Sequence, residues 1–138
     1  SFEGLPPPSP EKYPADLNDP HHTISFLAVT LEKVKANFAK YDLLDSQVVF
    51  LVGWFSKTLS SAPISRLAVL RLDGDMYEST MDSLTHLFPK LSIGGYIIID
   101  DFSFSGAKQA VLDYRAKNGI VDDIIPIDWT GVYWRRSR

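Results

Sequence analysis

The sequence has 138 residues, of which 45% are hydrophobic and 22% charged, and its formal net charge is −3. This length and composition are typical of one globular domain with its own core and exclude disordered and collagen-like chains. There is no cysteine, no apolar run near the ~18 residues of a membrane span and no basic surplus, so we expect no thiolate chemistry, membrane or nucleic-acid partner, and predict a cytoplasmic protein.

Six of the nine prolines lie within the first 20 residues. Because proline fixes φ and lacks a backbone N–H, residues 1–23 are predicted to form a leader loop and not a helix or an interior strand. Two interpretations remain open, a flexible tail and a loop folded over a site. Phe2, Leu5 and Tyr13 favour the folded loop, since disordered tails are poor in such residues.

The chain then alternates between helical and strand patterns. Apolar residues recur at helical spacing over residues 31–41, behind Thr30 as an N-cap. The unbroken run VVFLV at 48–52 predicts a strand covered by helices on both faces, and LAVLRL at 67–72 predicts the next strand. Ser79 and Asp82 resemble a capping box at the start of a helix whose apolar face continues to Leu91.

The second half of the chain repeats this alternation. A strand is predicted at residues 96–99 and a helix from about residue 107 to Gly119. Two short strands, at 124–127 and 132–134, are expected to pair as an antiparallel hairpin at one edge. Strands alternating with helices predict an α/β fold with a mostly parallel sheet.

Four aspartates follow two of the predicted strands. Asp73 and Asp75 leave the strand at 67–72, and Asp100 and Asp101 leave the strand at 96–99. Ligands of open α/β sheets bind beyond the carboxyl ends of the strands, and consecutive strands are often neighbours, so the four carboxylates are expected to converge.

Each aspartate taken alone is better explained as a turn former. Four carboxylates together repel one another unless a cation neutralises them. A set of oxygen ligands without cysteine favours a hard ion, Mg²⁺ before Ca²⁺ or Mn²⁺. The spacing therefore predicts a divalent-cation site at this edge.

Other candidates give weaker signals. His21 and His22 lie in the leader, where adjacent histidines suit a loop contact better than a metal site. The Gly53-Trp54-Phe55 corner either stacks on a flat ligand or packs in the core.

The sequence as a whole resembles the macrocin O-methyltransferase family, the sugar O-methyltransferases of antibiotic biosynthesis. The resemblance runs in order along the chain and rests on these blocks: SFEGLP at 1–6, FLAV at 26–29, VKANF at 34–38, VFL at 49–51 before GWF at 53–55, LRLDGDMYEST at 70–80, GYIIIDD at 95–101 and WTGVYWRR at 129–136. The LRLDGD and IDD segments are the most specific of them.

The resemblance implies an O-methyltransferase of the class I fold that uses S-adenosylmethionine (SAM) and Mg²⁺. Carried over by position, the metal ligands are Asp73, Asp100 and Asp101, and Asp75 is the general base. The same resemblance places four residues at the cofactor: Gly53 and Trp54 beside the adenine, together with Ser1 and Phe2. The expected acceptor is a small molecule with a vicinal diol, as in a sugar of a natural product.

The chain also departs from the family pattern. It lacks the glycine-rich turn and the ribose-binding acid that precede this region in a class I methyltransferase. We therefore expect a single, N-terminally incomplete domain over residues 1–138, a partial Rossmann-like sheet that lacks strands 1 and 2. Family strands 4-5-7-6 would remain as a block, and strand 3, at 48–52, would have lost its partner.

Three arrangements would accommodate this gap. The chain is a fragment of a longer protein, or its open edge pairs with another chain, as in a homo-oligomer, or strand 3 moves beside strand 4 to give the order 3-4-5-7-6. The functional alternative to an enzyme is a non-catalytic remnant or interaction module that keeps the fold and the metal site.

Overall fold

A four-stranded mixed sheet forms the centre of the fold in a computed structural model that describes residues 1–138. Its strands are β1 (Leu67–Leu72), β2 (Leu91–Ile99), β3 (Ile125–Pro126) and β4 (Val132–Arg135), in the order β1-β2-β4-β3. This order agrees with the predicted block 4-5-7-6 and with the predicted hairpin. The expectation of a mostly parallel sheet is wrong, because β1–β2 is parallel while β2–β4 and β3–β4 are antiparallel.

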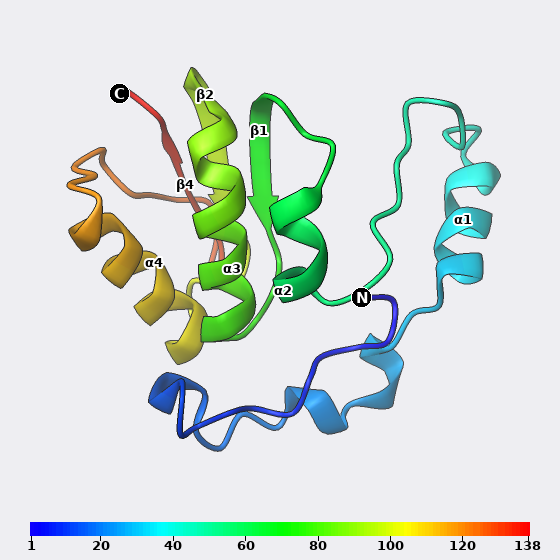
Figure 1. Ribbon diagram of the computed structural model, residues 1–138, viewed down its shortest axis with the longest axis horizontal. Coiled ribbons are helices and arrows are strands. Elements are labelled where there is room, and N and C mark those ends of the chain that lie inside the picture. The colour runs from blue at the N-terminus through cyan, green and yellow to red at the C-terminus, as the bar shows by residue number, and fades with distance from the viewer.

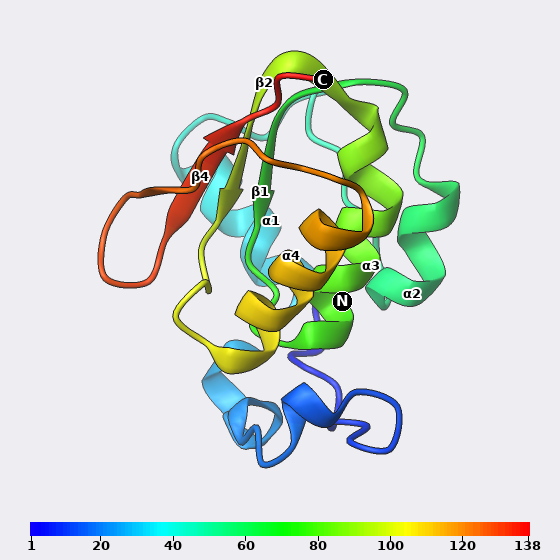
Figure 2. The same cartoon turned by 90° about the vertical axis from the view of Figure 1, so that its left-hand side faces the viewer.

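Helices α3 (Tyr77–Leu87) and α4 (Ser105–Lys117) cover one face of this sheet, and the short α2 (Phe55–Thr58) lies beside α3 (Figure 1). Alternate strand residues point into the core against these helices, as period-two side-chain geometry requires. Leu84 of α3 and Trp134 of β4 are both fully buried there. Figure 2 shows the helices and the sheet as two layers seen from the side. None of the helices has the length and apolar character needed to cross a membrane.

The other face of the sheet and its β1 edge are not covered by helices. Val69 on β1 remains 53% exposed and Tyr96 on β2 44% exposed. Helix α1 (Leu31–Lys40) lies to the side of β1, away from α3 and α4, and none of its residues is buried (Figure 1). Its N-cap is Thr30, as predicted, and the Lys33 N–H donates to the Thr30 Oγ1.

The predicted strand at residues 48–52 is wrong, because these residues belong to no strand. No neighbouring strand supplies hydrogen-bond partners, and two of the side chains, Val49 and Val52, are 68% and 58% exposed. The arrangement with this segment beside strand 4 is therefore also wrong. In the structure β1 is an edge strand.

The boundaries of α3 differ from those predicted. The helix begins at Tyr77 with Met76 as N-cap, so Ser79 lies inside the first turn and the predicted capping box is wrong. The helix ends at Leu87 because Pro89 lies in a following 3₁₀ turn and lacks an N–H for the α-helical pattern. Leu91 is thus the first residue of β2 and not the last apolar residue of the helix.

The leader, residues 1–23, runs along the end of the molecule where β1 and β2 end and α3 and α4 begin (Figures 1 and 2). It contains two short 3₁₀ turns, Pro14–Asp16 and His21–Thr23, and a third turn, Ser25–Leu27, follows it. Its prolines are thus found in a loop, and that loop lies at the edge of the sheet that carries the aspartates.

Candidate active site

Three of the four predicted aspartates come together at the ends of β1 and β2. Carboxylate oxygens of Asp73, Asp75 and Asp101 all lie within 4.8 Å of one another. Leu72, the last residue of β1, pairs with Ile99, the last residue of β2, so the two strands release their aspartates side by side. The sequence prediction of converging carboxylates therefore agrees with the structure for these three residues.

Asp75 reaches the cluster because the chain turns sharply after β1. Its φ is +56°, in the left-handed region that non-glycine residues seldom adopt and that aspartate tolerates better than most. The Asp75 N–H donates to Asp101 Oδ2 at 3.0 Å. One backbone hydrogen bond thus holds the carboxyl groups of Asp75 and Asp101 close together.

The pKa values of two aspartates in this cluster are raised. Burial, together with the charge of Asp101, raises the pKa of Asp75 from 3.8 to about 7, and the nearby His21 partly opposes this rise. Burial also raises the pKa of Asp101, although hydrogen bonds from Asp75 oppose it. The pair therefore favours binding a proton or another cation over the doubly charged state.

The fourth aspartate, Asp100, lies next to the cluster but points to Arg71. The guanidinium of Arg71 contacts Asp73 Oδ2 at 2.8 Å through Nη1 and Asp100 Oδ1 at 2.9 Å through Nη2. Sequence reasoning did not assign a role to Arg71. A signal was available, because Arg71 is the only charged residue in the apolar strand β1, and residues two apart, such as Asp73, share its side of an extended chain.

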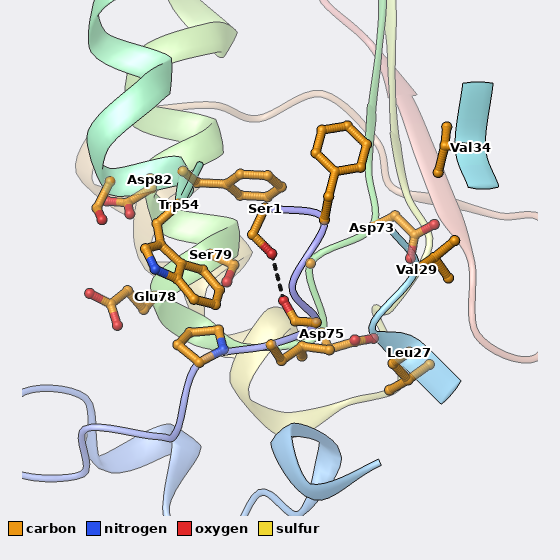
Figure 3. Close-up of a pocket in the computed structure, with 17 residues that line it drawn as sticks. Ser1, Leu27, Val29, Val34, Trp54, Asp73, Asp75, Glu78, Ser79 and Asp82 are labelled. Atoms are coloured by element: carbon orange, nitrogen blue, oxygen red, sulfur yellow. Dashed lines mark hydrogen bonds between the residues drawn. The ribbon is translucent and has the colours of Figure 1, made fainter. Parts of the chain in front are cut away.

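A cavity of about 670 Å³ opens beside the carboxylates (Figure 3). Its lining includes Asp73 and Asp75 and three of the predicted cofactor residues, Ser1, Phe2 and Trp54. The fourth, Gly53, immediately precedes Trp54 but does not line the cavity. Its φ of +130° is accessible to glycine and sets the direction in which Trp54 leaves the segment.

The aromatic residues around this cavity are divided between packing and lining. Phe2 packs edge-on against Phe50 at 6.2 Å, which fixes the start of the leader to the extended segment at 48–52. Trp54 is half-buried and lines the cavity, whereas its neighbour Phe55 both lines the cavity and packs against the hydrophobic core. The core interpretation therefore agrees with Phe55, and stacking of Trp54 on a flat ligand stays a prediction.

The structure adds one buried acid that the sequence gave no reason to select. Asp16 of the leader is 1% exposed and its carboxylate accepts from the N–H of Tyr77 at 2.6 Å and of Glu78 at 3.3 Å. Burial raises the pKa of Asp16, while these two hydrogen bonds act in the opposite direction. No local pattern could reveal a partner that lies some 60 residues further along the chain.

The leader histidines make loop contacts, as predicted. The Nδ1 of His21 lies 2.9 Å from Asp19 Oδ1, and the His21 ring packs on Phe104 with ring centres 5.0 Å apart. His22 Nδ1 lies 3.2 Å from the Asp19 carbonyl oxygen. Neither histidine belongs to the carboxylate cluster.

Comparison with solved structures defines the class of the fold. The structure of the O-methyltransferase NovP superposes with a TM-score of 0.95 at 54% sequence identity, covering 100% of this chain and 58% of NovP. The calicheamicin methyltransferase CalS11 shares the fold, with a TM-score of 0.69 at 18% identity over 97% of this chain and 57% of CalS11. The α/β fold described above is therefore that of a methyltransferase structure.

The sequence narrows this class to a family. Residues 1–136 match the family model of macrocin-O-methyltransferase (TylF), and the chain belongs to this family. One curated relative is the demethyldecarbamoylnovobiocin O-methyltransferase of Streptomyces niveus, which is 54% identical over 100% of this chain and 53% of that protein. Another is the mycinamicin III 3''-O-methyltransferase of Micromonospora griseorubida, which is 49% identical over 99% of this chain and 55% of that protein.

A third relative is 52% identical over 99% of this chain and 53% of its own length. It is the 8-demethyl-8-(2,3-dimethoxy-alpha-L-rhamnosyl)-tetracenomycin-C 4'-O-methyltransferase of Streptomyces olivaceus. The chain thus spans about half the length of the curated relatives that it matches. The family predicted from the sequence blocks is confirmed. The expectation that the chain matches only part of a family member's length is confirmed as well.

Proposed function

We propose that this chain forms the metal- and acceptor-binding part of an O-methyltransferase that uses SAM and Mg²⁺ and methylates a sugar hydroxyl with a neighbouring hydroxyl. The observation that carries the proposal is the convergence of Asp73, Asp75 and Asp101 beside a cavity lined by Ser1, Phe2 and Trp54. The family membership and the names of the three relatives support the methyl transfer and the sugar acceptor.

The chemistry of the cluster fits a hard divalent cation. Its donors are carboxylate oxygens only, which Mg²⁺ prefers, and they are close enough to share one ion. Burial is the main cause of the raised pKa of both Asp75 and Asp101, and a bound cation would offset the cost of keeping these carboxylates away from water. We propose Asp73 and Asp101 as ligands, together with Asp100 if its carboxylate leaves Arg71.

The cavity is a suitable place for the adenosine end of the cofactor. Trp54 offers an aromatic face and Phe2 is held by Phe50 at the same opening. We propose that Ser1, Phe2, Gly53 and Trp54 border the cofactor on this side. We propose that its remaining contacts come from class I strands 1 and 2.

The proposed mechanism divides the work among the aspartates. Bound Mg²⁺ would lower the pKa of a coordinated hydroxyl, and SAM would supply an electrophilic methyl group. Asp73 and Asp101 would hold the ion, and Asp75 would accept the proton of the reacting hydroxyl. Asp75 suits this role because its carboxylate lies in the cluster and its N–H bonds Asp101.

The fold suggests where the rest of the domain would lie. We propose that residues 1–138 are part of one methyltransferase domain and that class I strands 1 and 2 fit between β1 and the extended segment at 48–52. The uncovered edge of β1 and the exposed side chains of Val49 and Val52 support this arrangement. Alternatively, a second copy of this chain or another protein pairs with the uncovered edge of β1. A cytoplasmic location stays a prediction.

The same open edge favours one competing function. The alternative that we retain is a non-catalytic remnant or interaction module that keeps the fold and the metal site but binds no cofactor. The two functions differ in cofactor binding, since losing several buried hydrogen bonds at ~1–3 kcal/mol each would abolish measurable SAM affinity.

Isothermal titration calorimetry with S-adenosylhomocysteine, with and without Mg²⁺, separates these functions. Micromolar binding that improves with Mg²⁺ supports the methyltransferase proposal and justifies a screen of glycosides with vicinal diols. Mg²⁺ binding without cofactor binding supports the remnant. Absence of Mg²⁺ binding refutes the metal site in both.

Matched variants locate the metal. Asp101→Asn should remove most of the Mg²⁺ affinity, because Asp101 is a buried member of the cluster. Asp113→Asn is the control, since it removes a carboxylate on α4 that bonds the Tyr77 hydroxyl outside the cluster. Equal Mg²⁺ affinities in the two variants would contradict the assignment.

A further inference from the structure

Helix α3 begins without a capping side chain of its own. The first N–H groups of a helix have no intrahelical partner, and Met76 at the N-cap position has no side-chain oxygen to offer. Asp16 of the leader supplies the missing acceptor by bonding the N–H groups of Tyr77 and Glu78. A carboxylate at this end also interacts favourably with the helix dipole. Asp16 is thus a helix cap provided by a distant part of the chain.

The close packing of α4 against this cap occurs at Gly106. Gly106, in the first turn of α4, has no side chain, and a Cβ placed there would contact Asp16 Oδ1 and lie 2.9 Å from the Tyr77 nitrogen. A side chain at position 106 would therefore displace the Asp16 carboxylate. The close approach of α3, α4 and the leader depends on this glycine.

Further contacts fasten the leader on either side of Asp16. The Tyr13 and Tyr77 rings lie 5.4 Å apart, and Lys12 Nζ lies 3.8 Å from Glu78 Oε1. On the α4 side, His21 packs on Phe104, the residue before the helix. The leader therefore crosses the N-terminal ends of both helices, with its one buried carboxylate between them.

The capped turn leads directly to the carboxylate cluster. Asp75 lies two residues before Tyr77, in a left-handed conformation, and its N–H bonds Asp101. The short loop that carries Asp75 is therefore held at one end by β1 and at the other by the first turn of α3. Without Asp16, the N–H groups of Tyr77 and Glu78 lose their acceptor, and the α3 end of the loop that carries Asp75 loses its only carboxylate anchor from the leader.

We propose that Asp16 is a positioning residue for the carboxylate site, acting through the N-terminal turn of α3 to hold Asp75 against Asp101. This inference deepens the proposed function and rests on it, because the site that Asp16 organises is the proposed metal and base site. Asp16 itself touches no reacting group. Its role is to make the leader part of the active-site scaffold.

The test compares Asp16→Ala with the control Asp113→Asn, which removes another acid that contacts Tyr77 but at its side-chain hydroxyl. Two readouts are needed, the Mg²⁺ dissociation constant by calorimetry and amide hydrogen exchange at Asp75 and Tyr77. The Asp75 N–H orients the proposed ligand Asp101, and loss of a group that orients a metal ligand weakens metal binding by about tenfold or more. We expect that loss in Asp16→Ala, with faster exchange at Asp75, and a change of less than about twofold in Asp113→Asn.

Two further variants keep the test decisive if Asp16→Ala does not fold. Gly106→Ala retains the carboxylate but displaces it, and should weaken Mg²⁺ binding and speed exchange at Asp75 in the same way. Asp16→Asn retains one oxygen acceptor and should restore part of both readouts.

A cap that serves stability alone would give a different result. The melting temperature of Asp16→Ala and Gly106→Ala would fall, while Mg²⁺ affinity and exchange at Asp75 would equal those of the control, and this would overturn the inference. If the unmodified protein binds no Mg²⁺, the metal part of the proposed function fails. Exchange at the Asp75 amide then decides the inference without reference to a metal.

Discussion

Replacing Asp75 by asparagine removes one of two carboxyl groups that oppose each other at the site. The change keeps the shape of the side chain, and asparagine tolerates the left-handed backbone conformation that Asp75 adopts. It also allows the new amide to donate a hydrogen bond to Asp101. We therefore expect Asp75→Asn to stabilise the metal-free protein at alkaline pH.

The size of this effect follows from the pKa of Asp75, which burial and Asp101 raise from 3.8 to about 7. Because the folded state holds the proton more tightly than the unfolded state, stability is full below about pH 4 and falls as the pH rises through about 7. At 1.36 kcal/mol per pH unit the shift corresponds to at most about 4 kcal/mol. Partial exposure of Asp75 to solvent reduces this to about 2 kcal/mol.

Urea unfolding in EDTA, at pH values from 4 to 8, measures this difference. At pH 8 Asp75→Asn should be more stable than the unmodified protein by about 2 kcal/mol, and near pH 4 the two should agree. Asp113→Asn, an exposed acid on α4, should show no such pH-dependent gain. If Asp75→Asn is equally or less stable at pH 8, burial and Asp101 do not raise the pKa of Asp75 as the structure indicates.

Three other predictions concern the core, α1 and the metal. Leu84→Ala should lower the free energy of unfolding by about 2–5 kcal/mol in urea titrations, since Leu84 is fully buried; a loss below about 1 kcal/mol would contradict the packing described for α3. Thr30→Ala should cost α1 about 1 kcal/mol. Because no residue of α1 is buried, the loss should speed amide exchange within α1 and leave the global urea midpoint unchanged. At pH 8, Mg²⁺ should raise the melting temperature of the unmodified protein but not of Asp101→Asn, and an equal rise in both would place the ion elsewhere.

The extent to which sequence predicts this fold depends on where each residue finds its partner. Thr30 caps the helix that follows it, so the pattern around it was sufficient. The apolar runs of β1 and β2 pair with each other, and their aspartates converge as expected. The segment at 48–52 has the same kind of apolar run but no neighbouring strand, and a strand is defined by the hydrogen bonds that a neighbour supplies.

The start of α3 could not be predicted from the local sequence either. Ser79 and Asp82 offered a plausible local cap, but the helix begins at Tyr77 because Asp16 provides a better one from the leader. A long-range hydrogen bond leaves no periodicity for sequence reasoning to detect. Asp100 illustrates a related point, since its neighbour Arg71 determines where its carboxylate points in the absence of a cation.

The shared space of Asp16 and Gly106 has a practical consequence for engineering. An exchange of leaders between relatives would change one wall of the cavity, because residues of the leader line it. In such a chimaera a side chain at position 106 would displace the capping carboxylate of the new leader. The leader and the first turn of α4 therefore form one exchangeable unit, and a successful graft should transfer both segments together.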